Sequence, residues 1–257
     1  MVNAIVMSLM LVVALGVFAF LMVPRLRLLA AAQPTNRFDQ VPERVKSVLK
    51  FAIGQWRMPR VLIAGVALIF IFLGFLVVSL SSVQHIVHAY APGWHLLPSP
   101  LNELYTLVKD LIEVLVLLGV SYALYRRLSP APSRVGRSWE GVFILMMITT
   151  LMLTDFLSYG AWMQAAAGDA PAPFVWWNPI GWLAGQLVAG TSSATAQTVG
   201  DAAWWIHCAT VLTFLNFLPI GKHFHVITGI PDVYFRNLEP YGAVPKMDLE
   251  DENAESY

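Results

Sequence analysis

The feature that most constrains this chain is the length of its uncharged apolar blocks. Three stretches contain no Asp, Glu, Lys or Arg: residues 4–23, 61–83 and 202–221. Each matches the roughly 20 residues that an α-helix needs to cross a hydrocarbon core. A helix also satisfies its own backbone hydrogen bonds, which lipid cannot do. The sequence therefore predicts an integral membrane protein.

Two further apolar stretches are each interrupted by one acidic residue, Glu113 within 111–125 and Asp155 within 141–163. They raise the predicted number of spans to five. Charged residues make up only 12% of the chain, about half the share found in soluble domains. We expect an all-α bundle of five transmembrane helices over residues 1–235, then a polar, acidic cytoplasmic linker or tail over 236–257. The first span lacks a basic leader and a small-residue cleavage site, so we interpret it as a retained helix.

The distribution of basic residues predicts the orientation. Residues 24–60 carry eight Lys or Arg and residues 126–138 carry four, whereas 91–102 and 163–201 carry none. Basic loops stay in the cytoplasm. The N-terminus is therefore expected outside and the C-terminus inside, which requires an odd number of spans and agrees with five.

Other segments have a simpler interpretation. Residues 41–51 have helical spacing with a basic face, which is typical of a helix lying on the membrane surface. Within 163–201, three tryptophans predict an interfacial helix near an aromatic belt. The single cysteine, Cys208, excludes an internal disulfide and any cysteine-held cluster within this chain. There is no phosphate-binding glycine loop, and we expect no nucleic-acid partner.

Five of the six histidines lie at the ends of predicted spans. His207 and His225 are 18 residues apart, which in one continuous helix is five turns and about 27 Å along one face. His223 would point to the other side. His85 and His88 share a face near the outer end of the second span, level with His207 on the fifth, antiparallel span.

A b-type haem needs two imidazoles from different helices, and helical bundles supply them. The level pairing predicts haem iron held by His207 and either His85 or His88. The alternative is that these histidines lie at the interface and reach toward water.

Four ionisable residues lie within predicted spans: Lys109, Asp110 and Glu113 in the third, and Asp155 in the fourth. Lys109 and Glu113 are four residues apart and can pair. Such residues are costly in lipid and usually face the bundle interior. Two interpretations stay open: a structural ion pair, or a functional role in which Lys109 pairs with a haem propionate and the carboxylates conduct protons to a quinone.

The inner end of the fifth span carries Asn216, Lys222 and His223. A quinone carbonyl needs a hydrogen-bond donor, and its reduction needs a proton source. These residues could supply both, and the alternative for Lys222 is a side chain that reaches to the membrane surface.

The stretch from His207 through FLNFLP to KHFH resembles the last span of the nitrate reductase gamma-subunit family, a five-helix cytochrome b. A closer resemblance is to the N-terminal membrane domain of iron–sulfur oxidoreductases related to heterodisulfide reductase, including electron-transfer-flavoprotein:menaquinone oxidoreductases. It rests on FIFLGFLVV (70–78), LVKDLIEVLVLLGVSYALYRR (107–127), LTDFLSYGA (153–161) and LPIGKHFHVITGIPDVYFRNLEP (218–240).

This resemblance implies a multi-pass protein of the bacterial cytoplasmic membrane, the membrane component of a quinone-linked oxidoreductase. Electrons would pass between a cytoplasmic iron–sulfur or flavoprotein partner and menaquinone through haem b. In the family, 4Fe–4S clusters lie in a cytoplasmic CCG-type module beyond the membrane domain. Here they would belong to a separate polypeptide or to the rest of a longer chain.

The sequence departs from the family at Leu68, where a histidine usually stands. A second haem on His225 would need another ligand, or His225 serves a quinone instead. Two other functions stay open: a gamma-type cytochrome b that anchors another oxidoreductase, and a haem-free membrane anchor or transporter. A transporter should show repeat symmetry or paired broken helices, which the sequence lacks.

The first prediction concerns orientation. A reporter that is active only in the cytoplasm should be active when fused after residue 236, because the basic loops hold this end inside. The same reporter fused after Trp94 should be inactive. Activity of a periplasm-specific reporter at the first position would reverse the whole arrangement.

Overall fold

A computed structural model describes residues 2–33, 35–60, 62–129, 138–168 and 170–238. Within these residues all regular structure is helical. The elements are α1 (Val2–Ala30), α2 (Val41–Ser47), the π-helical turn η1 (Val48–Ile53), the 3-10 turn η2 (Met58–Arg60), α3 (Leu62–His88), α4 (Leu101–Leu128), α5 (Trp139–Ala167), α6 (Pro179–Gly185), η3 (Gln186–Val188), α7 (Ser193–Phe217), η4 (Lys222–Phe224) and α8 (His225–Tyr234).

The five long helices α1, α3, α4, α5 and α7 coincide with the five predicted spans, and the all-α prediction is confirmed for the described residues. Three of them, α1, α3 and α5, are long and apolar enough to cross a membrane. The other two have comparable lengths, 28 and 25 residues, but carry more charged or polar side chains. Membrane crossing by α4 and α7 stays a prediction.

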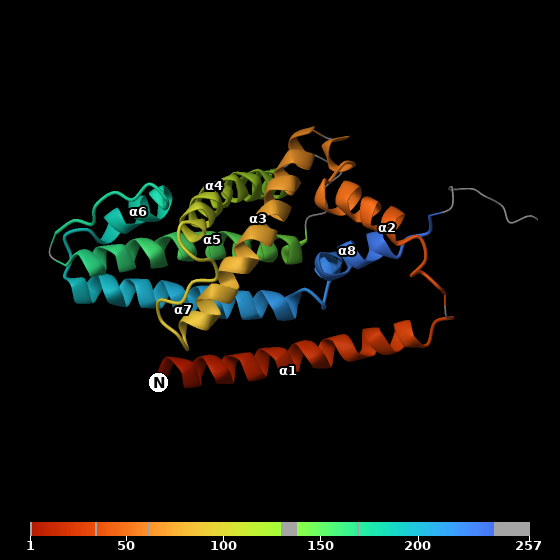
Figure 1. Ribbon diagram of the computed structural model, residues 1–257, viewed down its shortest axis with the longest axis horizontal. Coiled ribbons are helices and arrows are strands. Elements are labelled where there is room, and N and C mark those ends of the chain that lie inside the picture. The colour runs from red at the N-terminus through yellow and green to blue at the C-terminus, as the bar shows by residue number, and fades with distance from the viewer. Residues whose placement is uncertain (1, 34, 61, 130–137, 169, 239–257) are drawn as a thin grey trace, which may run out of the picture.

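Helices α5 and α7 run side by side through the centre of the molecule (Figure 1). Helices α3 and α4 pack on each other and α4 also packs on α5, while α1 lies along α7. Met7 of α1 is buried against Trp204 and Cys208 of α7. Most of α1 is otherwise exposed, which suits a helix that faces lipid.

The connections gather at two opposite ends of the bundle (Figure 1). The α6 end carries residues 89–100 and 170–192, and the α8 end carries residues 35–60 and 218–238. At the α8 end, Arg44 donates from Nη1 to the carbonyl oxygens of Tyr234 and Arg236, both at 3.0 Å. The segments after the first and last long helices therefore lie together, as an odd number of passes requires.

The two predicted surface segments are helical. Residues 41–51 form α2 and most of η1, and Arg44 of α2 also bonds Asp39 at 2.8 Å. This hydrogen bond, more than any other contact, lowers the pKa of Asp39 below its usual value. The predicted interfacial helix is α6, which begins with Pro179 after the capping side chain of Asn178.

The predicted register between His207 and His225 is wrong. Helix α7 ends at Phe217, a turn follows, and α8 begins at His225 as a separate helix. Pro219 lacks a backbone N–H, and Gly221 at the start of η4 has an extended backbone, so neither continues a helix. The position of His225 therefore cannot be obtained by counting five helical turns from His207.

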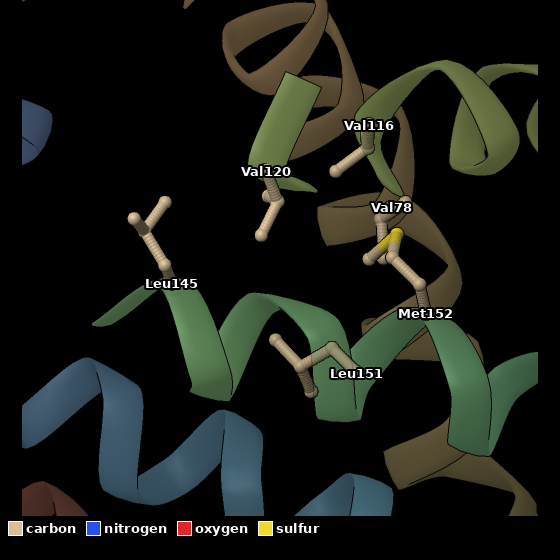
Figure 2. Packing of buried hydrophobic residues seen from close by; sticks show 6 residues of the cluster. All are labelled: Val78, Val116, Val120, Leu145, Leu151 and Met152. Carbon is tan, nitrogen blue, oxygen red and sulfur yellow. The ribbon is translucent and has the colours of Figure 1, made fainter. Parts of the chain in front are cut away.

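An apolar core joins α3, α4 and α5 on the side of the buried charges that faces the α8 end. It consists of Val78, Val116, Val120, Leu145, Leu151 and Met152 (Figure 2). Gly74 lets α4 approach α3 closely, because the side chain of Val116 occupies the space where a Cβ would lie.

Helix α6 packs on α5 through glycines at close range. A methyl group added to Gly160 of α5 would overlap the carbonyl oxygen of Gly181 and lie 2.9 Å from Cα of Gly185. These obstacles are backbone atoms, which cannot rotate away as a side chain could.

The second prediction follows from this contact. Gly160→Ala should lower the stability of the protein in detergent by about 1–3 kcal/mol, the usual cost of overpacking. Gly16→Ala is the matched control, because a Cβ there meets nothing within 4 Å and the site lies inside α1. The two variants are compared by their thermal unfolding midpoints. Equal midpoints would show that α6 does not depend on this approach.

Candidate functional site

Four long helices bring ionisable and polar side chains together inside the bundle. His85 comes from α3, Lys109 and Glu113 from α4, Asp155 from α5 and His207 from α7. Each is at most 2% exposed. We call these five residues the buried cluster.

Lys109 is the cation of the cluster. Its Nζ contacts Asp155 Oδ2 directly and lies 3.4 Å from Glu113 Oε2. The pairing of Lys109 with Glu113 is as the four-residue spacing predicts, whereas the contact with Asp155 joins residues 46 positions apart. With one ammonium and two carboxylates, an additional proton or cation would make the cluster neutral.

His207 is held in one tautomer by its neighbours. Its Nδ1 lies 3.1 Å from the carbonyl oxygen of Leu151, which can only accept a hydrogen bond. Nδ1 must therefore carry the proton, and Nε2, which lies 3.4 Å from the hydroxyl of Ser82, is unprotonated in the neutral ring. A ring nitrogen that donates to a backbone carbonyl while the other stays unprotonated is the usual arrangement of a metal-ligating histidine.

His85 lies beside His207. Their ring centroids are 4.5 Å apart with an angle of 84° between the planes. His85 Nε2 is 3.0 Å from Asp155 Oδ1, although the atoms are not aligned for a hydrogen bond. One ligand atom from each of His85, Asp155 and His207 falls within 4.8 Å of the others, so this set could hold a metal ion.

The structure distinguishes His85 from His88, which the spacing had left as equal candidates for the partner of His207. His88 is outside the cluster and stacks on Trp162, with ring centroids 4.9 Å apart. The backbone carbonyl of His85 accepts a hydrogen bond from Nε1 of Trp204 at 3.0 Å, which ties α3 to α7. Of the two candidates, His85 is therefore the one placed against His207.

Asp110 has a different position from its neighbours on α4. Its fully buried carboxylate accepts hydrogen bonds from the backbone N–H of Ile180 at 2.6 Å and of Gly181 at 3.2 Å. These hydrogen bonds pair two backbone N–H groups in the first turn of α6, which have no acceptor within the helix itself. The sequence offered no signal for this contact, because it joins residues 70 positions apart.

Hydroxyl side chains that sequence reasoning missed complete the surroundings of the cluster. Ser81 donates to Asp155 at 3.3 Å, Ser82 lies 3.4 Å from His207 Nε2, and Thr154 lies 3.3 Å from His207 Nδ1. A signal existed for each, since Ser81 and Ser82 sit in an otherwise apolar span and Thr154 precedes Asp155.

The residues predicted at the inner end lie about the α8 end, away from the buried cluster. Asn216 is on the last turn of α7, and His223 lies in η4 with Nδ1 3.5 Å from Glu140 Oε1. Burial lowers the pKa of His223, against the opposing effect of Glu140. The side chain of Lys222 lies outside the described part of the chain.

His225 and the position of Leu68 do not form a second ligand pair. Leu68 is 47% exposed on α3, and His225 is exposed at the start of α8. The structure brings His225 nearer to His223, with ring centroids 6.2 Å apart.

The ring nitrogens of His85 and His207 are of the type that would ligate haem iron, but the packing around them is closed. The adjoining cavity measures about 130 Å³ and is lined by Gln84, His85, His88, His95 and Tyr159, among others. Ligand sites usually measure about 300–1,000 Å³. A porphyrin would therefore require α3 and α7 to move apart.

The fold and the cluster define a helical protein with membrane-type helices and an ionisable site in its interior. The chain is similar to "Probable iron-sulfur-binding oxidoreductase FadF" of Bacillus subtilis, with 29% identity over 259 aligned positions that cover 99% of this chain and 36% of the relative. It is also similar to "EtfAB:quinone oxidoreductase" of Syntrophomonas wolfei, with 26% identity over 241 positions, 89% of this chain and 32% of the relative.

The chain thus spans about a third of the length of each curated relative. No family model matches it, so the resemblance to the nitrate reductase gamma subunit stays an expectation. No solved structure matches it either. The similarities relate the chain to iron–sulfur and quinone oxidoreductases.

The third prediction concerns the buried ion pairs. Lys109→Met should destabilise the protein by about 3–5 kcal/mol, because it leaves the carboxylates of Asp155 and Glu113 buried without a cation. Adding Asp155→Asn to Lys109→Met should recover part of this loss. Stability is measured by denaturant unfolding in detergent micelles.

Lys46→Met provides the matched control. Lys46 lies 4.0 Å from Glu43 with its side chain 75% exposed, and such a surface pair contributes at most about 1 kcal/mol. If Lys109→Met were as mild as this control, the cluster would not hold the four helices together.

Proposed function

We propose that this chain is the membrane electron-transfer part of a quinone-linked oxidoreductase, with haem b held between α3 and α7. The observation that carries the proposal is the pairing of His85 and His207. Two buried imidazoles from different helices lie side by side, and Leu151 leaves Nε2 of His207 unprotonated. Haem b with two histidine ligands needs two such imidazoles from different helices, with the haem between them.

The relatives support the electron-transfer role. One is named as an iron–sulfur-binding oxidoreductase and the other as an EtfAB:quinone oxidoreductase. In our proposal, a cytoplasmic iron–sulfur module of the CCG type exchanges electrons with this chain, and electron-transfer flavoprotein supplies that module. Menaquinone is the proposed substrate on the membrane side.

The proposed arrangement is five spans in a bacterial cytoplasmic membrane, with the α6 end outside and the α8 end inside. Contacts between distant segments support it. Tyr90 is 2.9 Å from Ser8 at one end, and Arg44 bonds to Tyr234 at the other. The basic segments then lie on the cytoplasmic side.

When bound, haem b supplies one-electron oxidation and reduction. The protein's residues orient it and set its surroundings. His85 and His207 would hold the iron, while the Leu151 carbonyl oxygen fixes the ring of His207 and Asp155 lies against His85. Lys109 pairs with Asp155, and its ammonium is the cation of the cluster with which a haem propionate could also pair.

Converting a quinone to a hydroquinone takes two electrons and two protons. Lys222, His223 and Asn216 at the α8 end are the proposed quinone-binding residues, and His225 remains a candidate there or for a second haem. Glu113 and Asp155 are the proposed proton carriers inside the bundle. The hydrogen bonds of Asp110 to α6 favour a structural role for that carboxylate instead.

A second candidate function is a haem-free membrane anchor for the same oxidoreductase partners. One observation favours it: the side chains around His85 and His207 are closely packed, with only a cavity of about 130 Å³ beside them. In that case the buried cluster serves to fix the packing of the four helices.

The fourth prediction separates these two functions. Full-length protein made with ample haem should show b-type bands in a reduced-minus-oxidised spectrum. His85→Ala and His207→Ala should each remove the bands, because each deletes an axial ligand. His88→Ala should keep them, since His88 stacks on Trp162 outside the cluster.

His95→Ala is a further control, because His95 is exposed in the loop after α3. If the wild-type protein showed no b-type bands, the haem-free anchor would be the function that remains. Bands that survive in His207→Ala would place the haem elsewhere.

A further inference from the structure

A groove follows the contact between α5 and α7 on the outside of the bundle. It measures about 370 Å³, within the usual range for ligand sites. Phe143, Met146 and Thr150 line it from α5, and Ile206, Ala209 and Thr213 line it from α7. We call it the α5–α7 groove.

The walls of this groove offer little to a polar ligand. The hydroxyl groups of Thr150, Thr210 and Thr213 donate to carbonyl oxygens one turn earlier in their own helices, at 3.0, 2.7 and 2.8 Å. The other lining atoms are aliphatic, aromatic or thioether groups. Methionine adapts to irregular apolar shapes. The groove therefore suits a hydrocarbon chain.

The same faces of both helices become polar toward the α8 end. Glu140 precedes Phe143 by three residues, and Asn216 follows Thr213 by three, so each continues its stripe by one turn. The rings of Phe143 and Phe217 pack across the contact with centroids 5.0 Å apart. Beyond them, His223 lies 3.5 Å from Glu140.

Among the residues that the structure describes, two buried atoms at this polar end have no hydrogen-bond partner. They are Oδ1 of Asn216 and Nδ1 of His223. The orientation of the Asn216 amide is set, because Nδ2 donates to the Leu212 carbonyl oxygen at 2.8 Å. Oδ1 can only accept, so this corner requires a donor. A buried acceptor left without one costs about 1–3 kcal/mol.

We propose that the α5–α7 groove and its polar end bind a polyprenyl quinone and its hydroquinone. The prenyl chain lies in the groove, and the ring lies at Asn216, His223 and Glu140. One hydroxyl of the hydroquinone donates a hydrogen bond to Asn216 Oδ1. The imidazole of His223 forms a hydrogen bond with the other ring oxygen. This site rests on the proposed quinone-linked function and gives it a location.

A phospholipid is the competing occupant. Its acyl chain would suit the groove, and the guanidinium of Arg127, which lies against Gly141, could attract its phosphate. The phosphodiester itself carries no hydroxyl proton, so a phospholipid could pair with Asn216 Oδ1 only through a donor elsewhere in its headgroup. The carboxylate of Glu140 beside His223 also disfavours a second negative charge there.

The test uses the full chain in phosphatidylcholine nanodiscs and a menaquinone analogue with a diazirine in its prenyl chain. Cross-links should map to residues 143–150 and 206–213, and menaquinone-4 should displace the probe. Ala209→Phe fills the groove and should raise the dissociation constant about tenfold or more. Ala202→Phe is the matched control, since Ala202 is also exposed on α7 but does not line the groove.

Asn216→Leu tests the polar end. It removes the acceptor and should weaken binding of the reduced probe about tenfold, with a smaller effect on the oxidised probe, which has no hydroxyl to donate. His223→Gln should weaken both forms. Circular dichroism checks that each variant is folded.

The outcomes distinguish a failure of the α5–α7 groove proposal from a failure of the proposed quinone-linked function. Cross-links elsewhere, or equal effects of Ala209→Phe and Ala202→Phe, overturn the groove while quinone binding itself survives. Displacement of the probe by phosphatidylglycerol but not by menaquinone-4 makes the groove a lipid site and also overturns it. Wild-type protein that neither binds the probe anywhere nor passes electrons to menaquinone-4 refutes the quinone-linked function as well.

Discussion

The contact between Lys109 and Asp155 is the interaction on which the interior of this protein depends. It joins α4 to α5, and Asp155 in turn lies against His85 of α3, whose ring packs on His207 of α7. An ammonium and a carboxylate are expensive to bury unless they meet each other. Since they come from different helices, this cost is avoided only when the helices adopt one particular rotation. The cluster therefore favours a single packing of four apolar helices that could otherwise slide past one another.

The cluster and the α5–α7 groove share the same two helices but use different faces. His207 points inward from α7, while its neighbour Ile206 lines the groove outside. The two proposed sites would therefore share α7, with the quinone ring nine residues further along this helix than His207. The apolar core of Val78, Val116, Val120, Leu145, Leu151 and Met152 packs α3, α4 and α5 together beside the cluster (Figure 2).

In our proposal, the α8 end is the surface that contacts the soluble partner. Basic residues of α2 and η1 lie beside α8, and Arg236 donates to Ser47 at 3.0 Å. These bonds fix residues 234–236 against α2 and η1. In the relatives, most of the protein lies outside the aligned third. Electrons that enter from the proposed partner at this end would arrive beside the quinone site that we propose.

The sequence by itself determined the class of the protein: five apolar helices, a basic segment after the first, and a pairing of Lys109 with Glu113. These features depend on length, composition and spacing within one helix, which periodicity predicts. Only the tertiary structure decided which faces meet. His85 and His88 lie on nearly the same face, and spacing could not choose between them until Trp204 and His207 were seen beside His85. Asp110 bonds to α6, and the break after Phe217 moves His225 off the register of α7. The reason is physical: helical periodicity orders residues within a turn or two, whereas contacts between residues 46 to 125 positions apart depend on how whole helices pack.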